Sequence, residues 1–511
     1  MEERKKTVVV GSGLSGLCAA YFCHRAGHDV TIFEAQPQRG MDTHRLVFPR
    51  TVQNDSLNDR SKGSSQQHPT APSTGPDIGP QDTHPPEGDL GMEGHLDVPL
   101  RVMSEDGWKT LLSLCQHLRV DTFPVDAPVT LGWLGGKTWF RSRTFKLGSQ
   151  SLPMLGSLRY INLSTLKIGQ NLARFYRDPL SPLDSKTDES LEDFFRHRDY
   201  DRVFSHGFLL PLLSTITTCR HEKLLAYPAT PLLDMVRQMI FGPPLRRLVG
   251  VTKALVDRLT VGIPMKSGSP VVSLKRGSAA SRSVSGKKTA SARRHQGAQK
   301  LHPTAPVSPP DRSHGLSPEP LIVTNARGDT ALADYVIFAT QANHLEFLEE
   351  LCPRERAILR NIEFDQGELV VHRDQTVMPS LRQDWTPLSY QMTHNYESSM
   401  FSVWVNPIEP TLSHGEPIFQ TWNPLQEIDP SKILRRISLE RAVVSLKTSN
   451  HLHQLSELMF QPQSRIFFCG SWAYPGVPLL ESAVKSAARV ALHLGVTLPM
   501  PIESSVLGHS A

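Results

Sequence analysis

The sequence has few cysteines and no long uninterrupted hydrophobic run. Its six cysteines are scattered over 511 residues, with no Cys-x-x-Cys pair and no His/Cys group at zinc-finger spacing. A disulfide framework is therefore not expected, and we predict a cytoplasmic location. The most apolar stretch, residues 8–23, is interrupted by three glycines. It is shorter than the roughly 20 residues of a membrane-spanning helix, so we expect a soluble protein with no transmembrane segment.

The sequence also lacks a strong excess of one charge. Lys and Arg number 55 against 50 Asp and Glu, which gives a net charge of +5. Residues 275–320 hold nine basic and two acidic residues, whereas residues 50–94 hold three basic and seven acidic ones. The rest of the chain is therefore close to neutral, and we predict no nucleic-acid partner. No His-Glu-x-x-His motif and no Gly-x-Ser-x-Gly motif is present. We predict no metal site and no nucleophilic hydrolase.

Proline is abundant, with 40 residues against 34 glycines. Twelve of the prolines fall in residues 50–94 and 275–320, six in each stretch. Both stretches are poor in apolar residues and cannot bury enough surface to offset the entropy of ordering them. We predict two disordered surface insertions. The basic second one is expected to be a solvated loop, with a localisation signal or a contact with an anionic surface as the alternative.

The strongest motif is glycine-rich and lies near the N-terminus. A β-rich run at residues 7–10 precedes Gly11-x-Gly13-x-x-Gly16, and a helical stretch follows. Gly11 allows a tight turn, Gly13 lets the backbone approach a pyrophosphate, and Gly16 lets the helix pack on the strand. The helix N-terminus offers N–H groups to phosphates. Glu34 closes the second strand, where a carboxylate accepts from ribose hydroxyls and disfavours a 2′-phosphate. The motif predicts a Rossmann-like site for NAD or FAD.

Two later segments favour FAD over NAD. Residues 268–274, followed by residues 333–340, resemble the strands that return to the nucleotide fold. Residues 465–471, followed by a helix, resemble a second flavin-contacting segment, where a helix start can place N–H groups against a flavin carbonyl or a phosphate. The three segments occur in the expected order, so we predict FAD as the cofactor.

Several further runs are spread along most of the chain outside the two insertions. They are Gly40-Met-Asp-Thr-His44, Leu96–Val102, Phe208–Leu213, Arg354–Leu359, Trp422-Asn-Pro424 and Phe468–Glu481. With the glycine motif, these runs make the chain resemble the flavin-containing amine oxidase superfamily. More narrowly, it resembles the poorly characterised amine-oxidase-like, FAD/NAD(P)-binding branch of bacteria and fungi, often encoded near cyclopropane-fatty-acid-type synthases.

The resemblance implies a set of cofactor-binding residues, with the early ones on the ADP half and pyrophosphate and the later ones around the flavin. They are Gly11, Ser12, Gly13, Leu14, Ser15, Gly16, Glu34, Ala35, Gly40, Met41, Arg101, Val102, Val271, Val272, Ala339, Thr340, Gly470, Ser471 and Glu481. Val271 or Val272 is expected near the adenine. No Ser-Gly-Gly-Cys-Tyr run precedes the last helix. The resemblance therefore implies non-covalent FAD.

The substrate site departs from that of the monoamine oxidases. Those enzymes usually place a Tyr two residues before the Glu of the last helix, where this chain has Leu479. An aromatic face stabilises an amine by about 0.5–2 kcal/mol, which Leu cannot do. An apolar substrate is therefore expected, and rigid aromatic residues commonly line such pockets. The predicted pocket residues are Trp404, Asn406, Trp422, Trp472, Tyr474 and Leu479. Flavin chemistry needs little acid–base help, so no catalytic residue is predicted.

We therefore predict an α/β chain in which a Rossmann-like FAD-binding domain is built from discontinuous segments and a mixed α+β substrate domain is inserted between them. The FAD-binding domain is predicted to comprise residues 1–49, 95–107, 249–274, 321–345 and 464–497. The substrate domain is predicted to comprise residues 108–248, which are mostly helical, and 346–463. The disordered insertions are residues 50–94 and 275–320, and residues 498–511 form a tail.

The predicted function is that of an FAD-dependent oxidoreductase that oxidises or desaturates a small or lipid-like substrate by hydride transfer to flavin. Three alternatives remain open. One is a flavin-binding accessory protein of a lipid-modifying partner enzyme, without turnover of its own. Another is a true amine oxidase, and the third is an NAD-dependent enzyme or an empty nucleotide fold.

Overall fold

The computed structural model describes residues 4–49, 93–135, 137–147, 150–156, 158–178, 189–277, 319–503 and 506. Most of the two predicted insertions lies outside these residues. Their described ends are strands: β4 (Glu93–Leu96) takes up residues 93 and 94, and β11 (Val271–Arg276) takes up residues 275 and 276. The predicted insertion boundaries therefore ran a few residues too far, because short polar ends of hairpin strands look like loop sequence.

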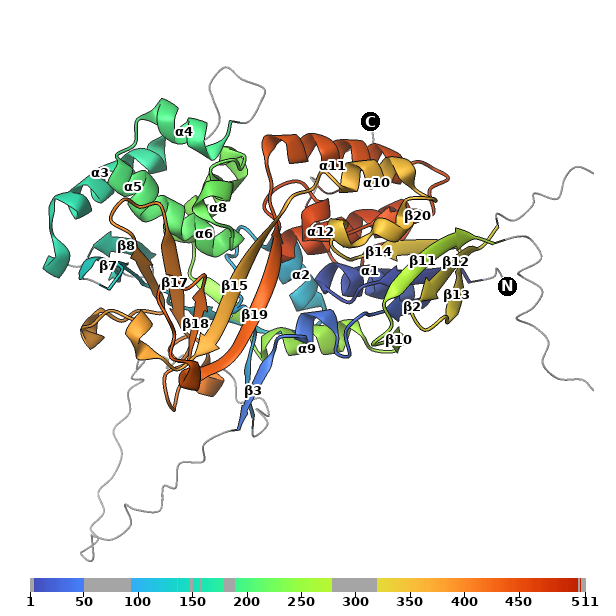
Figure 1. Cartoon of the computed structure of the whole chain (residues 1–511), viewed down its shortest axis with the longest axis horizontal. Helices are drawn as coiled ribbons and strands as arrows, with labels where there is room; N and C mark the ends of the chain where they lie inside the picture. The colour runs from blue at the N-terminus through green and yellow to red at the C-terminus, as the bar shows by residue number, and fades with distance from the viewer. Residues whose placement is uncertain are drawn as a thin grey trace, which may run out of the picture.

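One part of the molecule is built on a five-stranded parallel sheet in the order β10-β2-β1-β14-β20 (Figure 1). Its strands come from positions far apart in the sequence, and Val, Ile and Phe dominate four of them, as expected for a sheet covered on both faces. The strands are β1 (Lys6–Val10), β2 (Asp29–Phe33), β10 (Met265–Lys266), β14 (Tyr335–Phe338) and β20 (Ile466–Phe468).

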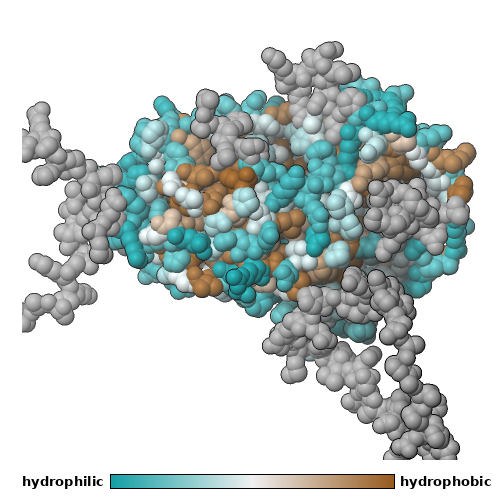
Figure 2. Space-filling model, turned by 180° about the vertical axis from the view of Figure 1, so that it is seen from behind, coloured by the Kyte–Doolittle hydropathy of each residue, from teal (hydrophilic) through white to brown (hydrophobic). Residues whose placement is uncertain are grey.

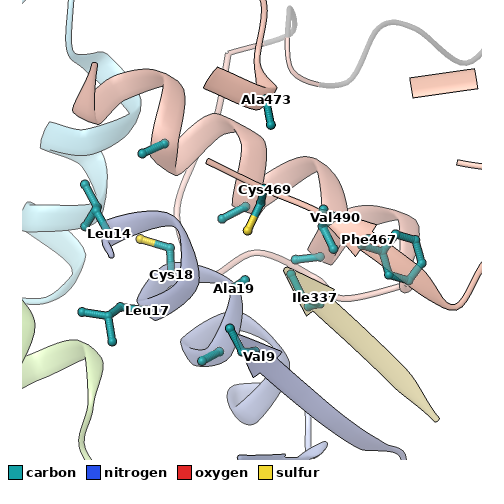
Figure 3. Close-up of a cluster of buried hydrophobic side chains, with 14 of the residues drawn as sticks. Val9, Leu14, Leu17, Cys18, Ala19, Ile337, Phe467, Cys469, Ala473 and Val490 are labelled. Atoms are coloured by element: carbon teal, nitrogen blue, oxygen red, sulfur yellow. The ribbon is translucent and has the colours of Figure 1, made fainter. Parts of the chain in front are cut away.

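Small residues let two helices pack closely beside this sheet. In α1 (Leu14–Arg25), every residue from Leu14 to Cys23 is buried, and the helix packs against α12 (Leu480–His493). Figure 3 shows Cys18 and Ala19 of α1 in one cluster with Ile337, Cys469 and Val490. Side chains of this size permit the close helix packing that holds the N-terminus of α1 at the carboxyl ends of β1 and β14. The other helices of this part are α2 (Lys109–His117), α9 (Val251–Leu259), α10 (Pro353–Leu359) and α11 (Leu446–Met459).

The other part is built on an eight-stranded sheet in the order β19-β15-β18-β17-β16-β6-β7-β8, with helices beside it (Figure 1). All neighbouring strands are antiparallel except β16 and β6. The strands are β6 (Val129–Trp133), β7 (Thr138–Leu147), β8 (Gln150–Gly156), β15 (Phe364–His372), β16 (Leu388–Met392), β17 (Ser399–Trp404), β18 (Phe419–Trp422) and β19 (Ile433–Ala442). The helices are α3 (Leu163–Arg177), α4 (Leu191–Arg198), α5 (Arg202–Phe204), α6 (Leu210–Thr217), α7 (His221–Leu224) and α8 (Ala229–Phe241). The predicted α/β class with a mixed second part is confirmed.

Three small antiparallel sheets complete the described chain. β3 (Leu46–Pro49) pairs with β4, β5 (Thr122–Val125) pairs with β9 (Leu245–Leu248), and β11 pairs with β12 (Leu321–Asn325), which pairs with β13 (Thr330–Ala333). Pro49 lies opposite Glu93, and Arg276 lies opposite Leu321. The described residues that flank each predicted insertion therefore lie side by side on paired strands.

Hydrophobic side chains form one large core cluster around the parallel sheet and a second between the eight-stranded sheet and its helices. A third, smaller cluster includes Val370, Trp385 and Phe419. On the face seen in Figure 2, which is the back of the view in Figure 1, hydrophobic residues form separate patches among hydrophilic ones. In the described ranges, no helix combines the length and apolar character needed to cross a membrane.

Candidate nucleotide and substrate site

The three glycines of the N-terminal motif have different surroundings. Gly11 has a φ of +102°, and a Cβ there would lie 2.8 Å from the Ala339 carbonyl oxygen. A Cβ at Gly16 would lie 2.1 Å from the Gly11 carbonyl oxygen. A Cβ at Gly13, by contrast, would meet no atom within 4 Å. The protein's own packing thus requires Gly11 and Gly16, while Gly13 leaves open the space into which a ligand would approach.

The N-terminus of α1 begins at this open space. Gly13 is its N-cap residue, no side chain accepts a hydrogen bond there, and the first turn holds no acidic residue. The first N–H groups of a helix lack intrahelical partners and carry partial positive charge. Leu14 and Ser15, which start the helix, are buried. This terminus therefore suits an anionic group such as a pyrophosphate.

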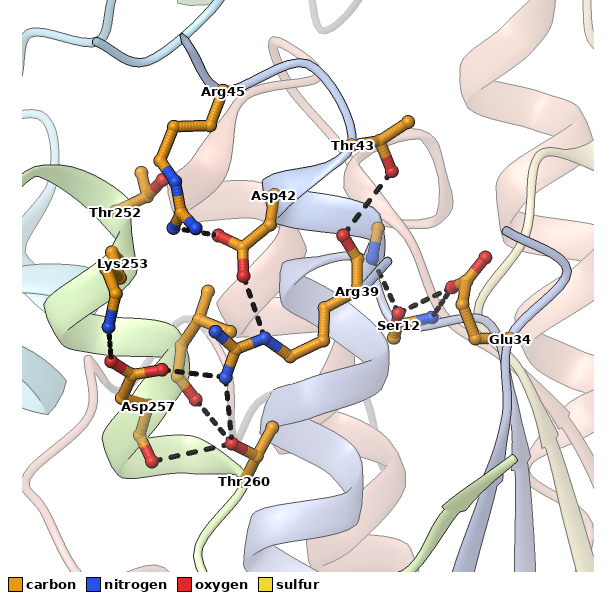
Figure 4. Close-up of polar contacts among 12 residues, drawn as sticks. Ser12, Glu34, Arg39, Asp42, Thr43, Arg45, Thr252, Lys253, Asp257 and Thr260 are labelled. Atoms are coloured by element: carbon orange, nitrogen blue, oxygen red, sulfur yellow. Dashed lines mark hydrogen bonds and ion pairs between the residues drawn. The ribbon is translucent and has the colours of Figure 1, made fainter. Parts of the chain in front are cut away.

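Glu34, at the end of β2, is buried and is tied to the glycine loop (Figure 4). Its Oε2 accepts hydrogen bonds from the Ser12 amide at 2.8 Å and the Ser12 hydroxyl at 2.5 Å, and its Oε1 accepts from the Gln36 amide at 2.8 Å. A carboxylate offers about four acceptor positions, so one remains for a ribose hydroxyl. Ala35 follows on the surface. Glu34 thus holds the glycine loop in place and keeps one acceptor position free for a hydrogen bond from a ligand.

The segment after Glu34 is held against the same loop. The Gly40 amide donates to the Ser12 hydroxyl at 2.6 Å, and a Cβ on Gly40 would approach Ser12 and Gly13 to about 3.0 Å. Arg39 forms ion pairs with Asp42 and with Asp257 of α9, each at 2.7 Å (Figure 4). Met41 packs on the core beneath. Arg39 therefore fixes Gly40 and Met41 beside the open space at Gly13.

The predicted adenine-side residues lie at the start of β11. The Ser269 amide donates to the Glu34 carbonyl at 2.8 Å, and the Gly268 amide donates to the Gln36 carbonyl at 2.9 Å. Val271 follows and packs on the core, whereas Val272 is 48% exposed. This turn therefore runs beside the residues that follow β2.

Two further predicted segments meet the glycine loop from β14 and β20. The Ala339 amide donates to the Val10 carbonyl at 2.7 Å, and the hydroxyl of Thr340 is buried without a partner among the described residues. The Gly470 amide donates to the Ser486 hydroxyl at 3.0 Å, and Ser471 follows it in a short helical turn. These segments lie next to α1 and α12, so the structure brings most of the predicted cofactor residues together.

Glu481 has a different environment from the one predicted. Its carboxylate accepts from the amides of Thr110 and Leu111, at 3.0 and 2.8 Å, and pairs with Lys485 at 3.2 Å. It therefore stabilises the N-terminus of α2, where a negative charge is favourable, and both oxygens face protein groups rather than an open site.

Arg101 and Val102 follow a segment that is bound to the eight-stranded sheet. The Gln420 side chain donates to the Asp97 carbonyl at 2.7 Å and accepts from the Leu100 amide at 2.8 Å. Val102 and Leu100 both line a cavity. The segment that was predicted to approach the flavin thus also forms part of the wall of a candidate substrate cavity.

The cavity has a volume of about 150 Å³ and lies between α6, α8 and the eight-stranded sheet. Its walls are mainly aliphatic and aromatic, with few polar groups. One of these is the hydroxyl of Tyr390, which lies 2.5 Å from that of Thr215. The lining includes Pro99, Leu100, Val102, Leu212, Thr215, Ile216, Thr218, Val236, Ile240, Tyr390, Gln420 and Trp422. An apolar substrate fits such a lining better than a polar one.

Of the six predicted pocket residues, Trp422 lines this cavity. Trp404 packs edge-on against Trp385 in the third core cluster. The side-chain amide of Asn406 instead binds backbone groups of the loop that follows β17. Trp472 donates to the Thr340 carbonyl at 2.9 Å.

Tyr474 packs on the core around the parallel sheet, whereas Leu479, the N-cap residue of α12, contacts both large cores. Leu479 thus lies where the two parts of the molecule meet.

Positively charged groups lie beside the cavity and were not predicted as a group. The Nε of Arg441 donates to the Thr218 hydroxyl at 2.7 Å. Burial, and then the positive charge of Arg101, lowers the pKa of Arg441 to about 10. Burial also lowers the pKa of Arg101, and Asp97 offsets part of that shift. The pKa of His44 is lowered by burial and by nearby arginines, Arg441 and Arg101 among them.

Among the described residues, no three His, Cys, Asp or Glu side chains come together as a metal site.

Comparison with known proteins gives a consistent result for the fold. A family model described as an NAD(P)-binding Rossmann-like domain matches residues 9–58. No curated protein sequence matches the chain. The solved structure of putrescine oxidase bound to putrescine matches with a TM-score of 0.55 at 12% identity, covering 97% of this chain and 100% of that chain.

Two further solved structures match over nearly their whole length. Cyclohexylamine oxidase from Brevibacterium oxydans IH-35A has a TM-score of 0.56 at 12% identity, covering 96% of this chain and 100% of that chain. An oxidoreductase from Methanosarcina mazei has a TM-score of 0.53 at 13% identity, covering 95% of this chain and 99% of that chain. Identities this low establish the fold alone. The predicted resemblance is confirmed at that level: residues 9–58 match a Rossmann-like domain, and the chain shares its overall fold with putrescine oxidase and cyclohexylamine oxidase.

Proposed function

We propose that the protein is an FAD-dependent oxidoreductase of the amine-oxidase-like type that binds FAD non-covalently. The observation that carries this proposal is the open space at Gly13, at an uncapped helix N-terminus and beside a buried carboxylate, Glu34. Gly13 and the first turn of α1 would hold the pyrophosphate, and Glu34 would accept from the ribose. The segments at Ala339–Thr340 and Gly470–Ser471 would approach the flavin.

A bound flavin supplies the capacity to accept a hydride from a substrate carbon atom. The contribution of the chain is to bind and orient the substrate and to exclude water. The apolar cavity beside Arg101 and Val102 suits both tasks, because its walls present few groups that could hold water. The proposed reaction is therefore the oxidation or desaturation of a small or lipid-like substrate.

Two alternatives keep the same fold. A true amine oxidase is suggested by the names of putrescine oxidase and cyclohexylamine oxidase, which share the fold. Arg101 and Arg441 beside the cavity oppose this reading, because positive charges repel a protonated amine. A flavin-binding accessory protein without turnover is the other alternative. It differs from an enzyme in that its flavin would not be reduced by any substrate.

The role of Gly13 can be tested with a matched pair of glycine variants. We expect Gly13→Val to fold normally but to lose at least about tenfold in FAD affinity, because its Cβ would meet no protein atom within 4 Å and its side chain would occupy the ligand space. Gly169→Ala in α3 is the control, since a Cβ there also meets nothing within 4 Å. Flavin absorbance and circular dichroism would be measured for both. A folded Gly13→Val protein with wild-type FAD content would refute the proposed cradle.

Turnover is tested separately with the wild-type holoprotein. Alkyl and acyl compounds, together with primary amines as a comparison set, would be added without oxygen while the flavin absorbance is followed. Bleaching by an apolar substrate supports the enzyme. Bleaching by amines alone would favour the true amine oxidase, and no bleaching by any compound would favour the accessory protein.

A further inference from the structure

Arg441 lies at the wall of the apolar cavity. Its guanidinium donates to the hydroxyl of Thr218 at 2.7 Å and lies 6.0 Å from the ring centroid of Trp422. Both Thr218 and Trp422 line the cavity. Arg441 is the last residue but one of strand β19. Its charged end is therefore held next to an otherwise hydrophobic space.

Arg101 belongs to another segment that contributes to the cavity wall. It stands between Leu100 and Val102, which both line the cavity, and its Nε is buried without a hydrogen-bond partner in the described chain. Its neighbour Arg247 differs, because Arg247 is paired with Glu409 at 2.5 Å. Arg101 thus carries a positive charge in a segment of the cavity wall, where it forms no ion pair with a described carboxylate and the charge of Asp97 compensates it only in part.

The nearest acidic groups have other partners. The carboxylate of Asp97 accepts from the amide and the hydroxyl of Thr252, at 3.1 and 2.6 Å. The carboxylate of Asp365 pairs with Arg220 at 2.6 Å. Arg441 likewise forms no ion pair with any described acidic residue. The charge of Arg101 lowers the pKa of Arg441, so the two guanidinium groups act on each other. Like charges that are only partly compensated are costly, which favours an anion from outside the chain at this site.

We propose that the cavity binds an amphiphilic carboxylate, with its apolar chain among the cavity side chains and its carboxylate bound by Arg101 and Arg441. The planar guanidinium group matches a carboxylate in shape and charge. An apolar chain alone would leave the two charges unbalanced, and an amine would add a third positive charge. The proposal rests on the proposed function, since it names the substrate class of the same site.

The binding preference can be measured on the purified holoprotein with three probes of equal chain length: decanoate, decan-1-ol and decylamine. Isothermal titration calorimetry gives the dissociation constants without requiring turnover. We expect decanoate to bind at least about tenfold more tightly than decan-1-ol and decylamine to bind most weakly, because a charge-assisted hydrogen bond contributes that much affinity. Equal binding of decanoate and decan-1-ol, or tighter binding of decylamine, would overturn the proposal.

Variants of the two arginines test whether these residues bind the carboxylate of decanoate. Arg441→Gln and Arg101→Gln should each weaken decanoate binding about tenfold or more and leave decan-1-ol binding unchanged. Arg436→Gln is the matched control, since Arg436 lies on the same strand but pairs with Glu368 at the surface. Thermal denaturation provides a second readout: removing an unbalanced charge should leave the unfolding temperature of Arg441→Gln equal to or above that of the wild type.

The alternative is that Arg101 and Arg441 bind a phosphate of FAD and not the carboxylate of a substrate. If the two arginines serve a phosphate of FAD, Arg441→Gln and Arg101→Gln will lower FAD content and leave the ratio of decanoate to decan-1-ol affinity unchanged, which would overturn the proposal. A protein that carries no FAD but still prefers decanoate would refute the proposed oxidoreductase alone, so the two failures are distinguishable.

Discussion

The nucleotide side and the cavity side of this molecule are built in different ways. At the nucleotide side, backbone groups and short side chains within about 30 residues form the glycine loop, the helix N-terminus and the buried carboxylate of Glu34. At the cavity side, the walls come from side chains far apart in the sequence, such as Leu100, Leu212 and Trp422. The first region therefore has a local sequence signature, and the second is created only by the tertiary fold.

The same difference appears among the glycines of the loop. Gly16 is required by the protein, because a Cβ would meet the Gly11 carbonyl oxygen, whereas Gly13 is required by nothing in the described chain. Within these six residues, the packing of the protein thus depends on Gly16, whereas Gly13 leaves the space that a ligand would need. The predictions below test this separation, beginning with the largest expected effect.

Substitution of Gly16 should destabilise the protein around the glycine loop. We expect Gly16→Val to lower the free energy of unfolding by about 3 kcal/mol or more, since a backbone oxygen cannot move away from the new side chain at little cost. Urea denaturation measures the change, with Gly169→Ala as the control. A Gly16→Val protein as stable as the wild type would show that packing does not distinguish Gly16 from Gly13.

A fall in pH should lower the stability of the cavity side of the molecule. Burial lowers the pKa of His221 in α7 and of His372 in β15 to about 4 from the ordinary value of 6.5. The unfolded chain therefore binds more protons between these values, and stability falls as the pH drops from 6.5 towards 4. At pH 5 each histidine should cost about 2 kcal/mol.

Urea midpoints at pH 7 and pH 5 measure this loss, and His372→Gln should reduce it. The exposed His453 supplies the control variant His453→Gln. A His372→Gln protein that loses as much stability as the wild type would show that His372 is not the group that titrates.

Glu481 should matter for stability and not for the cofactor. We expect Glu481→Gln to lower the free energy of unfolding by about 1–2 kcal/mol, because its charge faces the N-terminus of α2 and Lys485. FAD content should not change. Glu503→Gln is the control, since Glu503 also pairs with Lys485. Loss of FAD without loss of stability would restore the flavin contact predicted from the sequence.

The smallest effect is expected from shortening the first predicted insertion. Pro49 and Glu93 are paired, so an Asn-Gly turn can replace residues 50–92. FAD content should be unchanged and stability equal or slightly higher, because a shorter loop costs less entropy to close. Flavin absorbance and urea denaturation measure both. Loss of flavin binding would show that these residues take part in the site.

The sequence was sufficient for the parts of the site that depend on local geometry. Gly11, Gly13, Gly16 and Glu34 were predicted from a strand–glycine–helix pattern, and the structure brings them together. The cavity could not be predicted in the same way. Pairs such as Leu212 and Ile216 have the spacing of any buried helix face, so nothing in the sequence separates a cavity wall from ordinary core.

The contacts of the charged residues could not be predicted from the sequence either. The resemblance implied that Glu481 lies near the flavin, and only the tertiary structure reveals that its carboxylate accepts hydrogen bonds from the N-terminus of α2. Arg101 was predicted as a single residue near the flavin. Its association with His44 and Arg441 links segments more than 300 residues apart, and no spacing rule in the sequence could have indicated it.

The central claim is that the open space at Gly13 holds FAD. The most direct measurement is the amount of FAD released per chain when the purified wild-type protein is denatured, with separate titrations of FAD and NAD into flavin-free protein. We predict close to one FAD per chain and much weaker binding of NAD. A folded protein that releases no flavin and binds NAD as tightly as FAD would contradict the account.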